Sequence, residues 1–155
     1  KITDLAIPYL IQAGYINEKD AQNRYSWIKA MVSTVQESLS TIAEVPEKVK
    51  VFFEDEVEFE SDEVLEVLKA EQVPTLFQAL EEELNNVEEI DEEFAKGLMK
   101  KIQKKTGIKG KNLYMPVRVA LTGNLHGPEL VNIIYVLGKQ NVLKRIQYVK
   151  DNYLK

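Results

Sequence analysis

DEEFAKGLMKKIQKKTG, residues 91–107, holds the plainest structural signal in this chain. Apolar side chains recur there at every fourth position, and lysines recur at the same spacing, so each set lies on its own side of a helix. Asp91 precedes the pattern as an N-cap, acidic side chains fill the first turn and lysines fill the last, as the helix dipole favours. The apolar set is Phe94, Leu98 and Ile102, and the lysine set is Lys96, Lys100 and Lys104.

The same spacing of apolar residues continues on both sides of this segment. It predicts about eight or nine short helices and no convincing strand, so the expected fold class is all-α. No internal repeat of about 30–45 residues is visible, which argues against a helical solenoid. Residues 52–60 alternate apolar and acidic side chains, and we expect an acidic loop anchored by its aromatics. The other helices are expected at 3–13, at 20–39, after a cap at Ser40 with Pro46 inside the helix, from 62, from 74, at 116–121, at 128–137 and at 142–153.

Composition limits the kinds of chemistry available. The 155 residues are 45% apolar and 29% charged, which fits one ordinary domain or two small ones sharing a core. Cysteine is absent and His126 is the single histidine, so thiol chemistry is excluded and no metal site is predicted. No apolar run approaches the about 18 residues of a membrane span, and no membrane partner is expected. Because the first residue is Lys1 and no signal pattern follows, we expect a piece of a longer chain.

Charge is distributed unevenly along the sequence. Residues 54–93 hold seventeen acidic side chains and one lysine, a net charge of −16, whereas residues 94–155 hold thirteen basic side chains and two acidic ones, a net charge of +11. A basic C-terminal block in an acidic protein is typical of a polyanion partner, usually a nucleic acid. The alternative is that the two blocks pair within the chain. The charge pattern by itself leaves both interpretations open.

The sequence lacks the motifs of common enzymes. Residues 107–110 are too short for a phosphate-binding loop and no Ser or Thr follows. His126 has no nucleophile elbow and no cysteine partner, so a loop hydrogen bond is favoured over catalysis. Runs of carboxylates are expected to form a solvated surface. We therefore predict that this segment is itself non-catalytic.

Two neighbouring segments form a long ordered motif. GIKGKNLYMPVRVALTG, residues 107–123, is a basic glycine-hinged loop followed by a helix with one arginine and a glycine stop, and NLHGPEL, residues 124–130, is a tight turn into the next helix. Together they resemble the signature near the C-terminus of bacterial-type glutamyl-tRNA synthetases, which are class I enzymes. The resemblance extends over nearly the whole chain.

The resemblance implies a fold and a role. It implies an α-helical anticodon-binding cage of two packed helical subdomains, residues 1–70 and 71–155. The partner would be the anticodon stem-loop of tRNA-Glu, with tRNA-Gln as a second candidate. Catalysis, with ATP, Mg²⁺ and the glutamate pocket, would lie N-terminal to Lys1, and no cofactor is expected in this segment. The parent enzyme would be cytoplasmic and monomeric, and would attach glutamate to tRNA.

The family motif also assigns site residues. In that family the arginine after the proline grips the anticodon loop together with the turn into the next helix, which gives Arg118, Gly127, Pro128 and Leu130 here. Unstacked bases are read by stacking and by hydrogen bonds to their edges, and a planar cation beside an apolar shelf suits both. A structural ion pair with the acidic block is the other interpretation of Arg118. The residues expected to contact the RNA backbone are Lys104, Lys105, Lys109 and Lys111.

One position departs from the family pattern. The helix before Thr41 often has an arginine three residues ahead of that threonine, where it helps to read the third anticodon base, and this chain has Ser38 there. Because serine cannot make a bidentate charged contact, we expect relaxed discrimination between glutamate and glutamine anticodons.

Two other functions are compatible with the sequence. One is a helical protein–protein adaptor whose working surface is the acidic belt from Glu54 to Glu93. The other is an enzyme that uses a carboxylate pair, against which the missing nucleophile and phosphate loop already argue.

Overall fold

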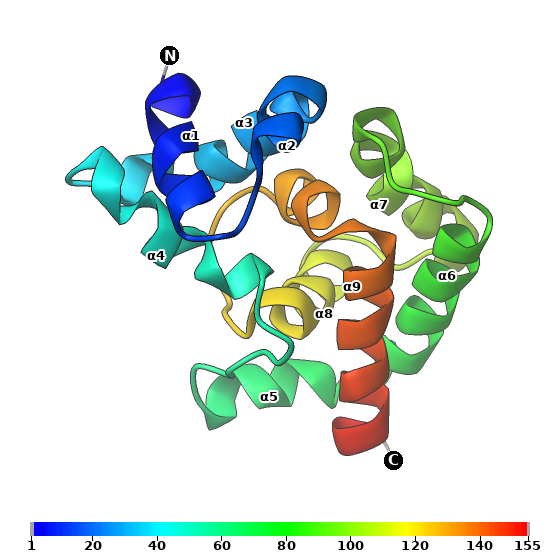
Figure 1. Ribbon diagram of the computed structural model, residues 1–155. Coiled ribbons are helices and arrows are strands. Elements are labelled where there is room, and N and C mark those ends of the chain that lie inside the picture. The colour runs from blue at the N-terminus through cyan, green and yellow to red at the C-terminus, as the bar shows by residue number, and fades with distance from the viewer. Residues whose placement is uncertain (1, 155) are drawn as a thin grey trace. The chain divides into compact units, whose positions relative to one another are not determined.

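The computed structural model describes residues 2–154, which form helices joined by turns and loops (Figure 1). No strand occurs within this range, so the expected all-α class is confirmed. None of the helices described combines the length and apolar composition needed to cross a bilayer. The α-helices are α1 (Ile2–Gln12), α2 (Glu18–Asn23), α3 (Tyr25–Val35), α4 (Val45–Val49), α5 (Asp62–Leu68), α6 (Val73–Asn85), α7 (Glu92–Thr106), α8 (Lys111–Thr122) and α9 (Leu130–Tyr153), and the 3-10 turns are η1 (Gln36–Ser38), η2 (Ile42–Glu44) and η3 (Lys50–Phe52).

The chain divides into two compact units after Asp55, earlier than the subdomain boundary near residue 70 that the resemblance implies. The difference arises from α5, which packs against α8 and so belongs with the second unit. The backbone of Glu60, just before α5, also donates a hydrogen bond to the carbonyl of Gly123 at 2.9 Å. The assignment of residues 1–70 and 71–155 to two anticodon-binding subdomains stays a prediction.

The first unit packs α1, α3 and α4 around buried apolar side chains such as Leu10, Ile28 and Met31. The prediction of a single helix over residues 20–39 is wrong. Asn17 and Asp20 form a capping box that starts α2, and Arg24 then leaves helical geometry (φ −126°, ψ 35°). A second helix, α3, therefore begins at Tyr25. The loop expected at residues 52–60 is confirmed beyond Phe52, which ends η3.

The second unit contains the predicted helix of residues 91–107. It runs as α7, and Asp91 caps it by accepting a hydrogen bond from the backbone of Phe94 at 2.7 Å. Gly107 ends it in the left-handed region (φ 78°), which glycine adopts without steric cost. Its inward residues Leu98 and Ile102 are fully buried where α7 packs on α6 and α9.

Helix α8 begins at Lys111, earlier than the expected start at Pro116. A proline inside a helix removes one N–H and leaves the carbonyl four residues earlier without its usual donor. That carbonyl belongs to Asn112, and the side-chain amide of Gln72 donates to it at 3.2 Å. A partner from the residue that precedes α6 (Val73–Asn85) thus allows the helix to pass through Pro116. The following helix begins at Leu130. Its helical backbone is interrupted at Gly138 (φ 78°, ψ 167°), where the sequence predicted that the helix would end.

The packing of the second unit can be tested by a substitution in its core. Phe77 of α6 is fully buried, so Phe77→Ala removes a large apolar side chain and leaves a cavity. We expect the free energy of unfolding to fall by about 3–5 kcal/mol, measured by denaturant titration. Its exposed neighbour Gln78 supplies the control, since Gln78→Ala should change stability by no more than about 0.5 kcal/mol. Equal losses in the two variants would contradict this packing.

Candidate functional site

An open hollow of about 350 Å³ lies where the first half of α8 faces the loop that follows its end. The helix supplies one wall, and residues 125–127 of the loop supply the other. This volume is near the lower limit of small-molecule sites, so the hollow accommodates a group of modest size. Its lining residues are Gly110, Lys111, Tyr114, Met115, Arg118, Leu125, His126 and Gly127.

The hollow is electrostatically positive. Lys111 and Arg118 line it, and no carboxylate does so among the residues described, although the chain has 25 acidic side chains. The N-terminus of α8 adds to this, because its N-cap is Gly110, which has no side chain to cap the free N–H groups. Such a helix end attracts negative charge. The arrangement therefore favours an anion.

Arg118 joins the two walls of the hollow. Its Nη1 donates a hydrogen bond to the carbonyl of Pro128 at 2.7 Å, which ties the far end of the loop to α8. Partial burial lowers the pKa of the guanidinium, but an arginine remains charged in a protein. The ion pair considered from the sequence does not form, since no acidic side chain lies within ion-pair distance of Arg118 among residues 2–154. Its remaining N–H groups are available to a ligand.

Two flat side chains beside Arg118 were not predicted. Tyr114 is 40% exposed, and His126 is exposed and lines the hollow. The loop hydrogen bond expected for His126 does not occur within the described residues. Tyr114 was detectable in the sequence, because Lys111, Tyr114 and Arg118 are spaced by three and four and so share one helix face. His126 offered no such signal, since the path of its loop depends on tertiary contacts.

The turn residues have separate roles. Gly127 lines the hollow next to Arg118: a Cβ atom there would lie 3.4 Å from Nη1. Pro128 contributes its carbonyl oxygen and does not line the hollow. Leu130 is only 5% exposed and packs in the core, so the expectation that it forms an apolar shelf for a base does not fit its position. Tyr114 and His126 present the flat surfaces instead.

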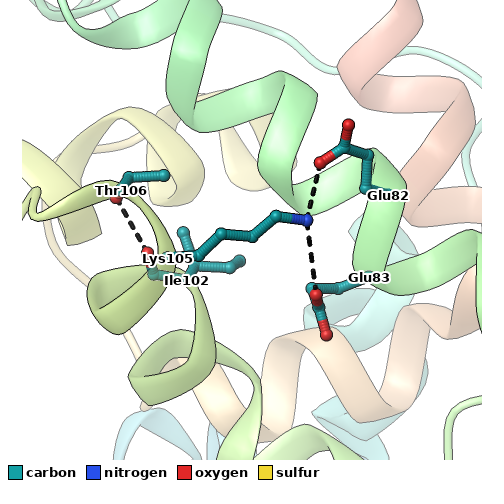
Figure 2. Close-up of polar contacts among 5 residues, drawn as sticks. All are labelled: Glu82, Glu83, Ile102, Lys105 and Thr106. Carbon is teal, nitrogen blue, oxygen red and sulfur yellow. Dashed lines mark hydrogen bonds and ion pairs between the residues drawn. The ribbon is translucent and has the colours of Figure 1, made fainter.

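The predicted lysines also separate into two groups. Lys104, Lys109 and Lys111 are exposed, and Lys111 lies on the rim of the hollow. Lys105 instead contacts α6, where its Nζ lies 2.6 Å from Glu82 and 3.5 Å from Glu83 (Figure 2). These contacts raise the pKa of Lys105. Its charge is already balanced, so Lys105 is a poor choice for an RNA-backbone contact.

Comparison with known proteins agrees with the geometry of the hollow. The sequence profile of a family described as "Anticodon binding domain" matches residues 1–150. The chain belongs to this anticodon-binding domain family. The resemblance to the anticodon-binding region of glutamyl-tRNA synthetases is thereby confirmed, and relatives of known name support it.

The relatives are longer proteins. The domain is 46% identical over 153 residues to "Glutamate--tRNA ligase 1" of Caldicellulosiruptor saccharolyticus, which covers 99% of this chain and 32% of the relative. It is also 46% identical over 153 residues to the glutamate–tRNA ligase of Clostridioides difficile, and this match covers 99% of this chain and 31% of the relative. A crystal structure of a glutamate tRNA ligase from Elizabethkingia meningosepticum shares the fold, with a TM-score of 0.76, 18% identity, and coverage of 98% of this chain and 29% of that one. The chain thus spans about a third of the length of these curated relatives.

Ser38 belongs to the first unit of the anticodon-binding domain, on η1. Its side chain is exposed, and its hydroxyl donates to the carbonyl of Val35 at 2.9 Å. The hollow is lined by residues of the second unit alone. Ser38 is therefore a separate candidate site.

Opposite charges of the domain are partly paired within the second unit. Besides the Lys105 contacts, Lys150 of α9 bonds Glu81 at 2.8 Å, so three successive acidic residues of α6 have basic partners. Lys139 is also engaged, donating to the carbonyl of Val87 at 2.8 Å. Internal pairing and an open positive hollow therefore coexist, and each explains part of the charge asymmetry.

The Lys105 contact gives a prediction that can be measured by titration. Lys105 lowers the pKa of the Glu82 carboxyl, so this contact stabilises the fold at pH values above the ordinary pKa of a glutamate, and that contribution is lost as the pH falls through the lowered pKa. In Lys105→Ala the pKa of Glu82 should rise toward its ordinary value, as followed by NMR of the carboxyl carbon. Lys104→Ala removes the adjacent charge, which has no ion-pair partner among residues 2–154, and should leave that pKa nearly unchanged. An unaltered Glu82 pKa in Lys105→Ala would refute the pairing.

Proposed function

We propose that this chain binds the anticodon loop of tRNA as part of a glutamate–tRNA ligase. The observation that supports this most directly is the acid-free hollow, where two cations and two flat side chains converge in a chain that is acidic as a whole. A nucleotide has the matching chemistry, since it combines an anionic phosphate with a flat base. Membership of the anticodon-binding domain family specifies which RNA to test first.

The side chains of the hollow suit a base that has left its stack. A splayed base stacks on the ring of Tyr114 or His126, at about 1–3 kcal/mol per base. The free N–H groups of Arg118 donate to the acceptors on its edge. The N-terminus of α8, with Lys111 beside it, attracts the phosphate. Lys104 and Lys109 add a sequence-independent attraction to the backbone.

The proposal includes the ligase as a whole. Because the chain spans about a third of relatives named glutamate–tRNA ligases, we place this domain in a longer enzyme that attaches glutamate to tRNA-Glu. ATP and Mg²⁺ would serve the catalytic part of that enzyme, and no described residue is assigned to them. A cytoplasmic, monomeric parent enzyme is part of the same proposal.

The adaptor function based on the acidic belt is not favoured. Glu81, Glu82 and Glu83 of that belt are bound to lysines of the same unit, so part of the presumed working surface is already occupied. The relatives and the family match point to RNA as well.

The proposal is tested by titrating the chain into an RNA hairpin that carries the anticodon stem-loop of tRNA-Glu. A hairpin with the same stem and an unrelated loop is the control. We expect tighter binding of the anticodon hairpin, and weakening of both complexes as salt rises. Equal binding of the two hairpins at every salt concentration would contradict anticodon recognition.

Arg118 and Lys109 should affect binding differently. Arg118→Ala removes a base-edge contact together with the bond that holds the loop at Pro128, so we expect a loss of at least about 1–3 kcal/mol and reduced anticodon preference. Arg118→Lys keeps the charge without the planar fork and should recover little of that preference. Lys109→Ala should weaken binding to all hairpins alike and lower the salt slope by about 1, whereas Lys109→Arg should restore both. Uniform losses in the alanine variants would argue against this division of roles.

Ser38 leads to a prediction on specificity. With serine at this position, the longer ligase should bind tRNA-Glu and tRNA-Gln with similar affinity, measured side by side. Ser38→Arg supplies a planar cation and should shift the preference toward tRNA-Glu. Ser40→Arg makes the same charge change at an exposed position two residues away and should not shift it. A strong preference for tRNA-Glu in the unaltered protein would count against the prediction.

A further inference from the structure

A short acidic segment crosses the end of α8. We call residues 57–60 the strap. The backbone N–H of Glu60 donates to the carbonyl of Gly123 at 2.9 Å. Gly123 is buried, and a Cβ atom placed on it would overlap the carbonyl oxygen of Glu58 and lie 2.9 Å from Cγ1 of Val57. The strap therefore lies directly on Gly123, and only a residue without a side chain permits this approach.

The strap is also held by α9. The ring of Phe59 packs edge-on against that of Tyr153, with centroids 5.3 Å apart and planes at 74°. Tyr153 in turn contacts Tyr148, at 6.4 Å. The side chains of Glu58 and Glu60 remain exposed. The strap thus makes its contacts through its backbone and its aromatic ring, and neither of its carboxylates has a hydrogen bond or ion pair with another described residue.

Gly123 is the first residue after α8, and the loop that lines the hollow follows it. At its start this loop is held by the N–H of Asn124, which donates to the hydroxyl of Thr122 at 3.2 Å. At its far end it is held by the bond from Arg118 to Pro128. Between these points, residues 125–127 make no backbone hydrogen bond with another described residue that would hold the loop in place. The position from which the loop starts is therefore important for where His126 and Gly127 lie.

We propose that Gly123 is a positioning residue, through which the strap sets the place of the loop that forms one wall of the hollow. The placement of the loop by Gly123 does not depend on the proposed function. Only its consequence rests on that function, namely that His126 and Gly127 are placed accurately against an RNA base. The acidic segment then has a structural role next to an RNA site, although its charge alone would repel RNA.

The chain contains a closely matched control. Gly107 ends α7 as Gly123 ends α8, and both have φ 78° with ψ near zero. A Cβ atom on Gly107 meets nothing within 4 Å. Gly107→Ala and Gly123→Ala therefore share the same left-handed strain, and only the second displaces the strap. Any excess effect in Gly123→Ala reports the contact with the strap.

The first measurement needs no RNA. Hydrogen exchange of the Asn124 amide, which donates to Thr122 at the start of the loop, should be faster in Gly123→Ala than in Gly107→Ala, by about tenfold, which corresponds to about 1.4 kcal/mol. Phe59→Ala loosens the strap from α9 without any clash and should change exchange in the same direction. Tyr148→Ala, which alters the outer ring of the same cluster, should have a smaller effect. Equal exchange in the two glycine variants, with no change in Phe59→Ala, would overturn the proposal.

The second measurement compares an intact anticodon hairpin with one that lacks the anticodon bases. In the unaltered chain the missing bases should weaken binding; in Gly123→Ala this difference should shrink, and in Gly107→Ala it should persist. A role in stability alone would leave the difference unchanged at temperatures where both variants are folded, and that result would contradict the proposal. If the unaltered chain does not distinguish the hairpins, the proposed function fails, and the exchange data still decide the role of Gly123.

Discussion

The hydrogen bond from Arg118 to the carbonyl of Pro128 is the contact on which the hollow depends. It links a helix to the end of the loop that follows, and it places a half-buried cation where no carboxylate of residues 2–154 competes for it. A guanidinium suits this because one N–H can hold the loop while others remain open to a ligand. Structural support and recognition are thus combined in a single side chain.

The second unit also separates its charges. On α6, consecutive carboxylates are neutralised by lysines of α7 and α9, while Lys104, Lys109 and Lys111 remain exposed, and Lys111 lines the hollow. Lys104 and Lys105 are neighbours in sequence, yet only Lys105 has ion-pair partners within the described residues (Figure 2). Exposed ion pairs of this kind add little stability. Their main effect here is to reduce the negative potential that would otherwise oppose an anionic partner.

Local signals in the sequence predicted the features that local physics governs. The all-α class, the Asp91 cap and the Gly107 end of α7 follow from periodicity and capping, and the family motif led to Arg118 and Gly127. The errors arose where tertiary contacts intervene. Gln72 satisfies the carbonyl that Pro116 exposes, which lengthens α8; burial of Leu130 and pairing of Lys105 depend on neighbours distant in sequence. Tyr114 was accessible to helix-face analysis, whereas the position of His126 was not.

Entry of RNA into the hollow between α8 and its following loop is tested most directly by NMR of the isotope-labelled chain during titration with the anticodon hairpin of tRNA-Glu. The signals to observe are those of the Tyr114 and His126 rings and of the side-chain N–H of Arg118. We expect these signals to shift first and to saturate together with those of the amides of residues 110–111 and 125–127. Shifts confined to the acidic segment between Glu54 and Glu93, with the three side chains of the hollow unchanged, would contradict it.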